Sequence, residues 1–160
     1  MRHSTIGKFL VVFVVLMIPL ASALAQSDEA MIEYRQKVMQ AIGANMGSTG
    51  AILKEKLPYQ GHIAHHAYQI QSASQLITSA FKKQLAEGKT DAKADIWKDW
   101  DKFAAAAKEL EQESGKLAMV AQSGDMAAIA EQVKAVGKAC GGCHKPFRKP
   151  KEESYKQMMK

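Results

Sequence analysis

Apolar residues recur at every third or fourth position along most of the chain after residue 26, which is the period of an α-helix with one buried face. No convincing run alternates between apolar and polar residues at every second position, as a half-buried strand would. Turn signals divide the periodic region into four segments. The pattern therefore predicts an all-α protein, folded as a single-domain, antiparallel four-helix bundle.

Capping and turn residues set the limits of these helices, which we expect over about residues 27–46, 63–85, 97–120 and 126–147. Ser27 or Asp28 is a suitable N-cap for the first helix. The glycine-containing stretch 47–50 is expected to weaken or end that helix, because glycine is a poor helix former. Asp125 is expected to cap the last helix, after a closing turn at residues 123–124.

Proline and glycine mark the remaining boundaries. The first connection passes through Pro58, which lacks an amide donor and disfavours helical geometry in the residue before it. A second loop is expected at residues 89–94, where apolar periodicity is absent, and Gly88 is a suitable residue to end the helix before it. Pro146 removes one hydrogen bond from the last helix, so we expect that helix to kink or to stop early.

The N-terminal residues have the features of a secretory signal peptide. Arg2 and Lys8 give a positive start, residues 9–20 form an apolar run, and residues 23–25 form a small-x-small cleavage pattern. The alternative is an uncleaved membrane anchor, but the apolar run is short for a spanning helix. We therefore expect residues 1–25 to be cleaved and residues 26–160 to form a periplasmic four-helix domain, without stable insertion in the membrane.

The chain is mildly basic. Its formal net charge falls from +6 to +4 once Arg2 and Lys8 are removed with the signal peptide. The densest basic group lies near the C-terminus, at Lys145, Arg148, Lys149 and Lys151. We interpret this group as a solvated, frayed chain end, with a docking patch for an acidic redox partner as the alternative. Nucleic-acid binding is not expected of an exported protein.

The only two cysteines, Cys140 and Cys143, stand in a C-x-x-C-H run that ends in His144. On a helix, residues three and four apart share a face, so both thiols and the imidazole point to the same side. This run is the attachment signature of c-type haem. It predicts one covalently attached haem c, bonded to Cys140 and Cys143, with His144 as an axial ligand of its iron.

Other uses of the two cysteines remain open. A disulfide between them suits an oxidising compartment but closes a very small loop and stabilises little. A thioredoxin-like redox pair requires a βαβ context that this chain lacks. A zinc site is chemically reasonable, with both thiolates, His144 and one of His62, His65 or His66 as ligands.

The chain resembles the class II cytochromes c, which are four-helix proteins with the haem motif near the C-terminus, and within them most closely the low-spin members; it is also related to cytochrome c′. The resemblance is carried by Tyr34–Met39 and Gly43–Gly47, by Ile96-Trp97 and Lys102-Phe103, and by Gly137–His144 with Phe147-Arg148. It covers most of the chain after the signal peptide.

This resemblance implies further site residues on the first helix. It places Met39 on the distal face of the haem, opposite His144. In the low-spin members a methionine there is the sixth iron ligand, whereas in cytochromes c′ the same position packs over an open, five-coordinate iron. We expect Met39 to be the axial ligand. Arg35 lies one turn before Met39, and the resemblance implies that it is the partner of a haem propionate.

Two functions follow from these alternatives. If Met39 and His144 saturate the iron, the protein is an electron carrier that serves redox partner proteins, which is the function we expect. If the iron is five-coordinate, the protein binds nitric oxide or carbon monoxide. No nucleophile with a neighbouring base and no phosphate-binding loop is present, so an enzyme is not predicted. Whether two copies form a homodimer through the first two helices is left open.

Overall fold

The computed structural model describes residues 27–158 of the 160-residue chain. The predicted signal peptide lies outside these residues, so its cleavage stays a prediction. In the part of the chain that the structure describes, no helix combines the length and the apolar character needed to cross a membrane.

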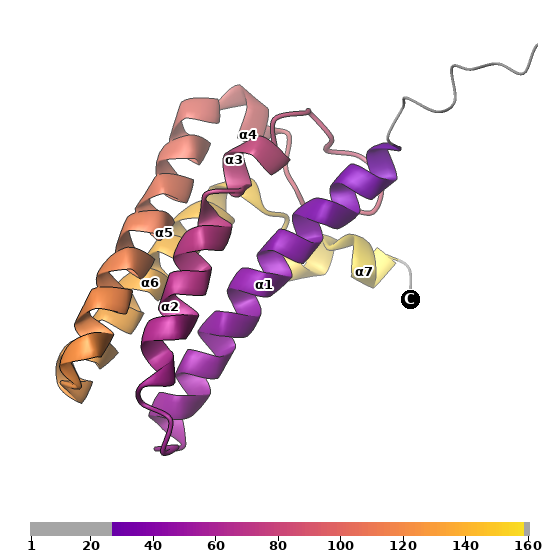
Figure 1. Ribbon diagram of the computed structural model, residues 1–160. Helices are drawn as coiled ribbons and strands as arrows, with labels where there is room; N and C mark the ends of the chain where they lie inside the picture. The colour runs from indigo at the N-terminus through magenta and orange to yellow at the C-terminus, as the bar shows by residue number, and fades with distance from the viewer. Residues whose placement is uncertain (1–26, 159–160) are drawn as a thin grey trace, which may run out of the picture.

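Four main helices confirm the predicted bundle (Figure 1). They are α1 (Asp28–Lys54), α2 (His62–Ser74), α5 (Trp100–Val120) and α6 (Met126–Phe147). The shorter elements are α3 (Ile77–Ala80), α4 (Asp95–Lys98), the 3₁₀ turns η2 (Ala121–Ser123) and η3 (Lys151–Glu153), and α7 (Tyr155–Met158). The only β-type pairing between residues 27 and 158 is an isolated bridge between Ala92 and Arg148.

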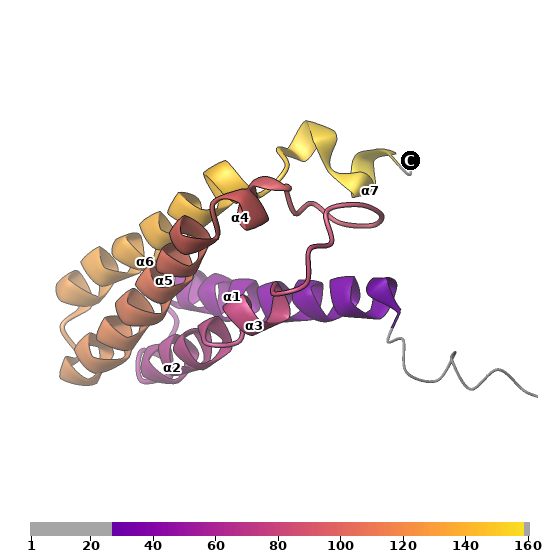
Figure 2. The same ribbon diagram turned by 90° about the horizontal axis from the view of Figure 1, so that it is seen from above.

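The bundle has two layers, with α1 and α2 in one and α5 and α6 in the other (Figure 2). Helix α2 packs against both α1 and α5, and α6 packs against α5. The apolar stripes meet between the layers, where Ile63, Ile70, Leu117, Ile129 and Val136 are fully buried. Each such side chain stabilises the fold by roughly 1.5–3 kcal/mol relative to an exposed one. The layers diverge toward the end that holds α4 and α7 (Figure 2).

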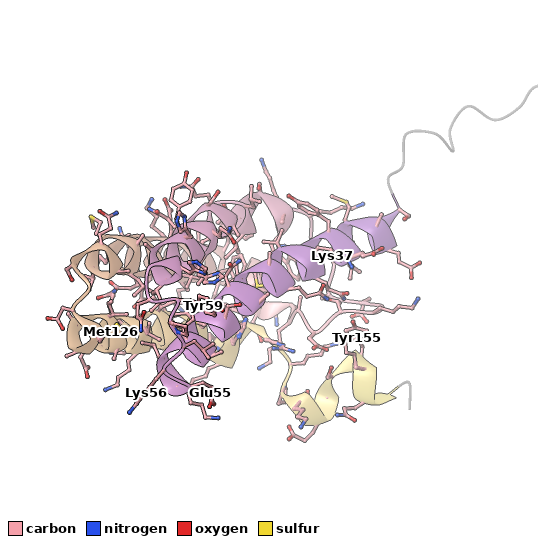
Figure 3. All side chains as sticks on the ribbon, turned by 60° about the horizontal axis from the view of Figure 1, so that its bottom comes forward. Lys37, Glu55, Lys56, Tyr59, Met126 and Tyr155 are labelled. Carbon is pink, nitrogen blue, oxygen red and sulfur yellow. The ribbon has the colours of Figure 1, made fainter. Side chains whose placement is uncertain are left out.

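Helix α1 is longer than predicted, because residues 47–50 do not end it. Thr49 is fully buried and donates a hydrogen bond to the Asn45 carbonyl at 3.0 Å, and Ile52 is also buried. This packing outweighs the helix propensity lost at each glycine, about 1 kcal/mol. The helix ends instead at Lys54, with Glu55 as its C-cap (Figure 3). Lys56 then takes a φ of 52°.

The second predicted helix is divided into α2 and α3, and the prediction of one continuous helix to residue 85 is wrong. The Ser74 hydroxyl donates to the Ile70 carbonyl at 2.7 Å, and the Leu76 amide turns back to the Ala73 carbonyl at 3.1 Å. From Phe81 the chain leaves the helix, so the predicted loop begins well before residue 89. The third predicted helix is likewise divided, into α4 and α5, at Asp99.

Helix α6 begins and ends close to its predicted limits. The Asp125 carboxylate accepts hydrogen bonds from the amides of Ala127 at 2.9 Å and Ala128 at 3.1 Å, which confirms it as the N-cap. At the other end the helix includes Pro146 and stops one residue later, at Phe147.

Replacement of Asp125 by alanine is expected to lower the free energy of unfolding by about 1 kcal/mol, because two amides at the start of α6 lose their acceptor. Urea unfolding followed by circular dichroism measures the change. Asp125→Asn is the matched control, since it keeps a capping oxygen and should lose less than half as much. Equal losses in the two variants would contradict the capping role.

The C-terminal segment is not frayed over residues 149–158, which corrects the sequence interpretation. The Lys149 amide donates to the Asp91 carbonyl at 2.8 Å, and the Arg148 guanidinium pairs with the Asp91 carboxylate at 3.3 Å. The segment then forms η3 and α7 beside the loop that precedes α4.

Candidate functional site

A cavity of about 350 Å³ lies where the two layers diverge. Helix α1 forms one wall and the end of α6 the opposite wall. The loop before α4 and helix α7 also line the cavity, together with single residues that follow α3 or lie in α4 and α5. The apolar part of the lining consists of Ile32, Phe81, Ala92, Ile96, Phe103 and Phe147. Such walls suit a flat apolar ligand with a small number of polar contacts.

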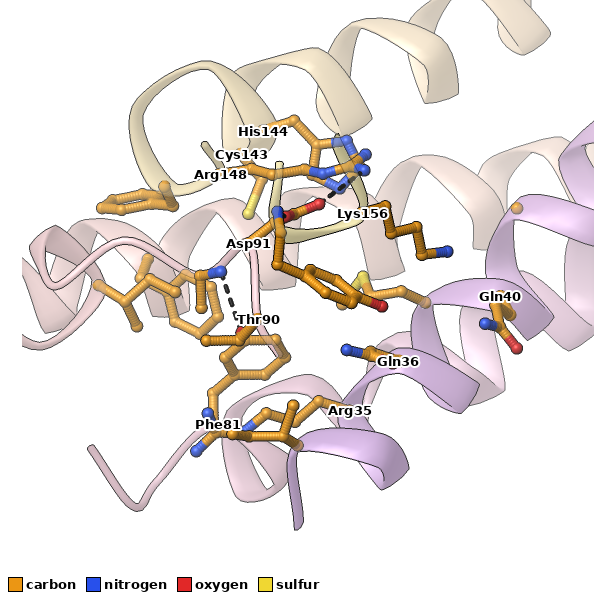
Figure 4. Close-up of a pocket in the computed structure, with 18 residues that line it drawn as sticks. Arg35, Gln36, Gln40, Phe81, Thr90, Asp91, Cys143, His144, Arg148 and Lys156 are labelled. Carbon is orange, nitrogen blue, oxygen red and sulfur yellow. Dashed lines mark hydrogen bonds and ion pairs between the residues drawn. The ribbon is translucent and has the colours of Figure 1, made fainter. Parts of the chain in front are cut away.

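The structure brings the C-x-x-C-H run to this cavity. Cys143 and His144 line it, and Figure 4 shows both on the same stretch of α6. Cys140, one turn earlier, is half-buried and packs against the hydrophobic core. Both thiols are free. The two sulfurs and the imidazole therefore lie on adjacent turns of one helix, as the sequence spacing predicts.

Burial shifts the titration of all three groups. It raises the pKa of the Cys140 thiol and raises that of Cys143 to about 11, with the neighbouring Cys140 as the smaller cause. Burial lowers the pKa of His144, and the positive charge of Arg148 lowers it further. A lowered pKa keeps the imidazole neutral at pH 7, and the neutral ring is the form that binds a metal ion.

Met39 lines the cavity from the other side, on α1. It is half-buried, and it shares its helix face with Arg35 and Gly43, four residues before and after it. Gly43 lines the cavity as well. His144 and Met39 thus approach the same cavity from opposite walls.

Arg35 is buried, with 2% of its surface exposed. Its Nε donates to the Ala80 carbonyl at 2.9 Å and its Nη1 to the Leu85 carbonyl at 3.1 Å, and Nη2 donates to the Lys83 carbonyl. Burial lowers its pKa, while the nearby charge of Asp28 raises it. The guanidinium therefore fixes the irregular chain after α3, a role that the sequence did not reveal.

This arrangement leaves two N–H donors of Arg35 for the predicted propionate contact. An arginine has five N–H donors, and the three bonds to carbonyls use three of them. The guanidinium also lies over two aromatic rings, 4.8 Å from the centre of Phe81 and 5.4 Å from that of Trp97. The propionate contact stays a prediction.

An aromatic cluster supports the cavity floor. Phe103 lies 5.3 Å from Phe81, 5.6 Å from Trp100 and 5.5 Å from Phe147, measured between ring centres. Trp97 donates its indole N–H to the Phe81 carbonyl at 2.8 Å. Offset and edge-to-face pairs of this kind hold their rings in fixed positions. Aromatic rings therefore pack against one another where α5 meets the end of α6.

The three histidines at the start of α2 do not join the cysteines in this cavity. His62 stacks on Tyr59 at 5.2 Å between ring centres, His65 is exposed, and His66 shares a hydrogen bond of 2.8 Å with Asn45. Over residues 27–158, no group of three or more His, Cys, Asp or Glu side chains is placed to hold a metal ion.

The cavity residues that were not anticipated from the sequence include Thr90, Asp91, Tyr155 and Lys156. The first two lie in the loop before α4 and the others in α7. Asp91 contacts residues 57 to 64 positions further along the chain. No local pattern announces a pairing of that kind, because it depends on the path of the loop and of the C-terminal segment.

The two thiols, the imidazole and the cavity lining fit a covalently bound haem. Two thiols on one helical turn match two vinyl groups, a neutral imidazole follows at once, and apolar side chains form the walls. A thioether approaches from the facing helix. A bound haem would supply an iron able to change oxidation state or to take up a small ligand.

Comparison with known proteins agrees with this arrangement. The model of the Cytochrome C′ family matches residues 30–148. A cytochrome c′ from Rhodospirillum rubrum is 39% identical over 127 residues, which is 79% of this chain and 86% of that protein. The structure of cytochrome c prime from Shewanella frigidimarina superposes with a TM-score of 0.73 and 30% identity, over 78% of this chain and 98% of the other.

A third similar protein was solved with a ligand. It is the nitric oxide complex of a cytochrome c prime variant from Alcaligenes xylosoxidans, with a TM-score of 0.68 and 27% identity over 76% of this chain and 96% of that one. The resemblance to class II cytochromes c is thus confirmed. This chain belongs to the cytochrome c′ family, and its cofactor is one covalently attached c-type haem.

Proposed function

We propose that this protein binds nitric oxide or carbon monoxide at a five-coordinate haem iron. The observation that carries the proposal is the match to cytochromes c′, one of which was solved as a nitric oxide complex. This function replaces the electron carrier as the favoured one.

The proposal gives each residue of the motif one task. Cys140 and Cys143 form the two thioether bonds that keep the haem on the chain outside the cytoplasm. His144 is the proximal ligand of the iron, and its lowered pKa favours the neutral imidazole that binds a metal ion. Met39 stands on the distal wall and limits the size and angle of an entering ligand without binding the iron. Apolar side chains such as Ile32, Phe81 and Phe103 would pack against the haem.

An electron carrier remains the second candidate function. The observation that favours it is Met39, whose thioether lines the same cavity as His144 from the facing helix. If Met39 bound the iron, no site would remain for a gas, and the protein would serve redox partner proteins in the periplasm. A thioether ligand also raises the reduction potential relative to a second histidine.

Replacing Met39 by leucine separates the two functions. For a gas-binding protein we expect the reduced wild-type protein to form a carbon monoxide adduct at once, and Met39→Leu to change the rate or affinity by less than about tenfold, a change in steric contact of about 1.4 kcal/mol or less. The measurement is a carbon monoxide titration followed by the Soret band.

Met46→Leu is the matched control, because Met46 lies on α1, packs against the core and does not line the cavity. It should behave as the wild type. If the wild-type protein does not react with carbon monoxide and Met39→Leu does, then Met39 is an iron ligand and the electron carrier is the correct function.

Export to the periplasm forms part of this proposal. It rests on the signal pattern of residues 1–25 and on the family, and it places haem attachment outside the cytoplasm. A homodimer through α1 and α2 stays a prediction, and the exposed Tyr34 of α1 and Tyr68 of α2 are residues that such an interface would cover.

A further inference from the structure

The segment that follows α6 has no part in the proposed function. The family match ends at residue 148, whereas the described chain continues through η3 and α7 to residue 158. We call residues 149–158 the C-terminal strap. Its last helix contributes to the lining of the haem cavity, so the strap closes one side of the site.

One carboxylate anchors the strap. Asp91 accepts hydrogen bonds from the Ser154 hydroxyl and from the Tyr155 amide, both at 3.1 Å, and it pairs with Arg148 at 3.3 Å. Its side chain is only 12% exposed, and Ser154 is buried. Charge-assisted hydrogen bonds of this kind are the strong ones, so the start of α7 is held in one position.

The anchor places Tyr155 and Lys156 at the cavity, next to the proposed haem ligands. Figure 4 shows Lys156 between His144 of α6 and Gln36 of α1. His144 of α6 and Met39 of α1 line the cavity from facing helices, and either could hold a haem between them. A side chain that lies between these two helices would then be placed to contact the edge of such a haem.

Lys156 is also a positive charge in the cavity lining whose ammonium makes no hydrogen bond or ion pair with residues 27–158. Arg35 donates to three backbone carbonyls, and Arg148 is paired with Asp91. Among residues 27–158, no carboxylate lies within ion-pair distance of Lys156, whose ammonium is 5.9 Å from the ring centre of Tyr155. The amine is available to a ligand that brings its own negative charge.

We propose that Lys156 binds a haem propionate and that the C-terminal strap covers the haem edge on that side. The proposal rests on the proposed function, because it requires a haem in this cavity. It is compatible with a propionate contact at Arg35, since a haem has two propionates. Lys156 is then a cofactor-binding residue supplied by a segment beyond the region that the family model matches.

The reduction potential of the purified haem protein tests this assignment. A cation at the propionate opposes the extra positive charge of the oxidised iron, so Lys156→Gln should lower the potential. Lys156→Arg, which keeps the charge, should restore it. Lys37→Gln is the matched control, because Lys37 is exposed on α1 and does not line the cavity. It should leave the potential close to the wild-type value.

A second experiment tests whether Asp91 holds Lys156 in place. In an Asp91→Ala background the strap is released, so Lys156→Gln should lower the potential by much less than it does in the wild type, and trypsin should cleave after Lys151 faster. Non-additivity of this kind indicates two residues that act as a unit.

Equal potentials for Lys156→Gln and Lys37→Gln, in a protein that carries its haem, would overturn the role of Lys156 and leave the proposed function intact. A full effect of Lys156→Gln in the Asp91→Ala background would also overturn it. If the wild-type protein matures without covalent haem, the proposed function fails, and the inference fails with it.

Discussion

Replacement of both Cys140 and Cys143 by alanine will abolish covalent haem attachment, and each single replacement will leave one thioether bond. The reason is chemical: each vinyl group of a c-type haem is held by one cysteine sulfur, and this chain has only two cysteines. After denaturation and extraction with acidified organic solvent, the wild-type chain should retain its haem and the double variant should retain none. Mass spectrometry of the intact chain measures this directly.

Lys145→Ala is the control for this test, since Lys145 follows the motif directly, is exposed and does not line the cavity. It should keep the full mass of the attached haem. Retention of covalent haem by the double variant would mean that another residue forms the bond, and the proposed site would be wrong.

Replacement of Arg35 by methionine is expected to lower the free energy of unfolding by about 3 kcal/mol. The change leaves three carbonyl groups, of residues 80, 83 and 85, without their donor, and an unsatisfied buried polar group costs about 1–3 kcal/mol. Part of this cost is offset, because the partly exposed loop can turn its outer carbonyls to water. Urea unfolding of the haem protein measures the difference.

Two further variants test the cause of that loss of stability. Arg35→Lys keeps the charge but has no planar fork of donors, so it should recover only part of the stability. Lys37→Met, an exposed position two residues further along α1, should change the free energy of unfolding by less than about 0.5 kcal/mol. A loss below about 1 kcal/mol in Arg35→Met would show that the loop does not depend on the guanidinium.

Arg35 also shows why part of the fold was not predictable from the sequence. The four apolar stripes and the caps of α1 and α6 follow from local spacing, and the structure confirms them. The break after Ser74 and the irregular chain after Phe81 are different. Apolar residues continue at helical spacing to Leu85, but the carbonyls of that segment bind a guanidinium located 45 to 50 residues earlier in the sequence.

The residues of the site also differ in whether the sequence predicts them. Cys140, Cys143 and His144 form a local motif, and Met39 was placed by resemblance; the structure puts Met39, Cys143 and His144 around one cavity. The contribution of the C-terminal segment was missed. Its basic residues read as a solvated end, because no short-range pattern connects them with Asp91, which lies in a different loop.

The proposed function depends on the coordination of the iron. The most direct test is the optical spectrum of the reduced, ligand-free haem protein, because the number of axial ligands sets the spin state. We predict the single broad visible band of a high-spin, five-coordinate haem with His144 as its only axial ligand. The sharp, well-separated pair of visible bands of a low-spin, six-coordinate haem, lost when Met39 is replaced by leucine, would contradict it.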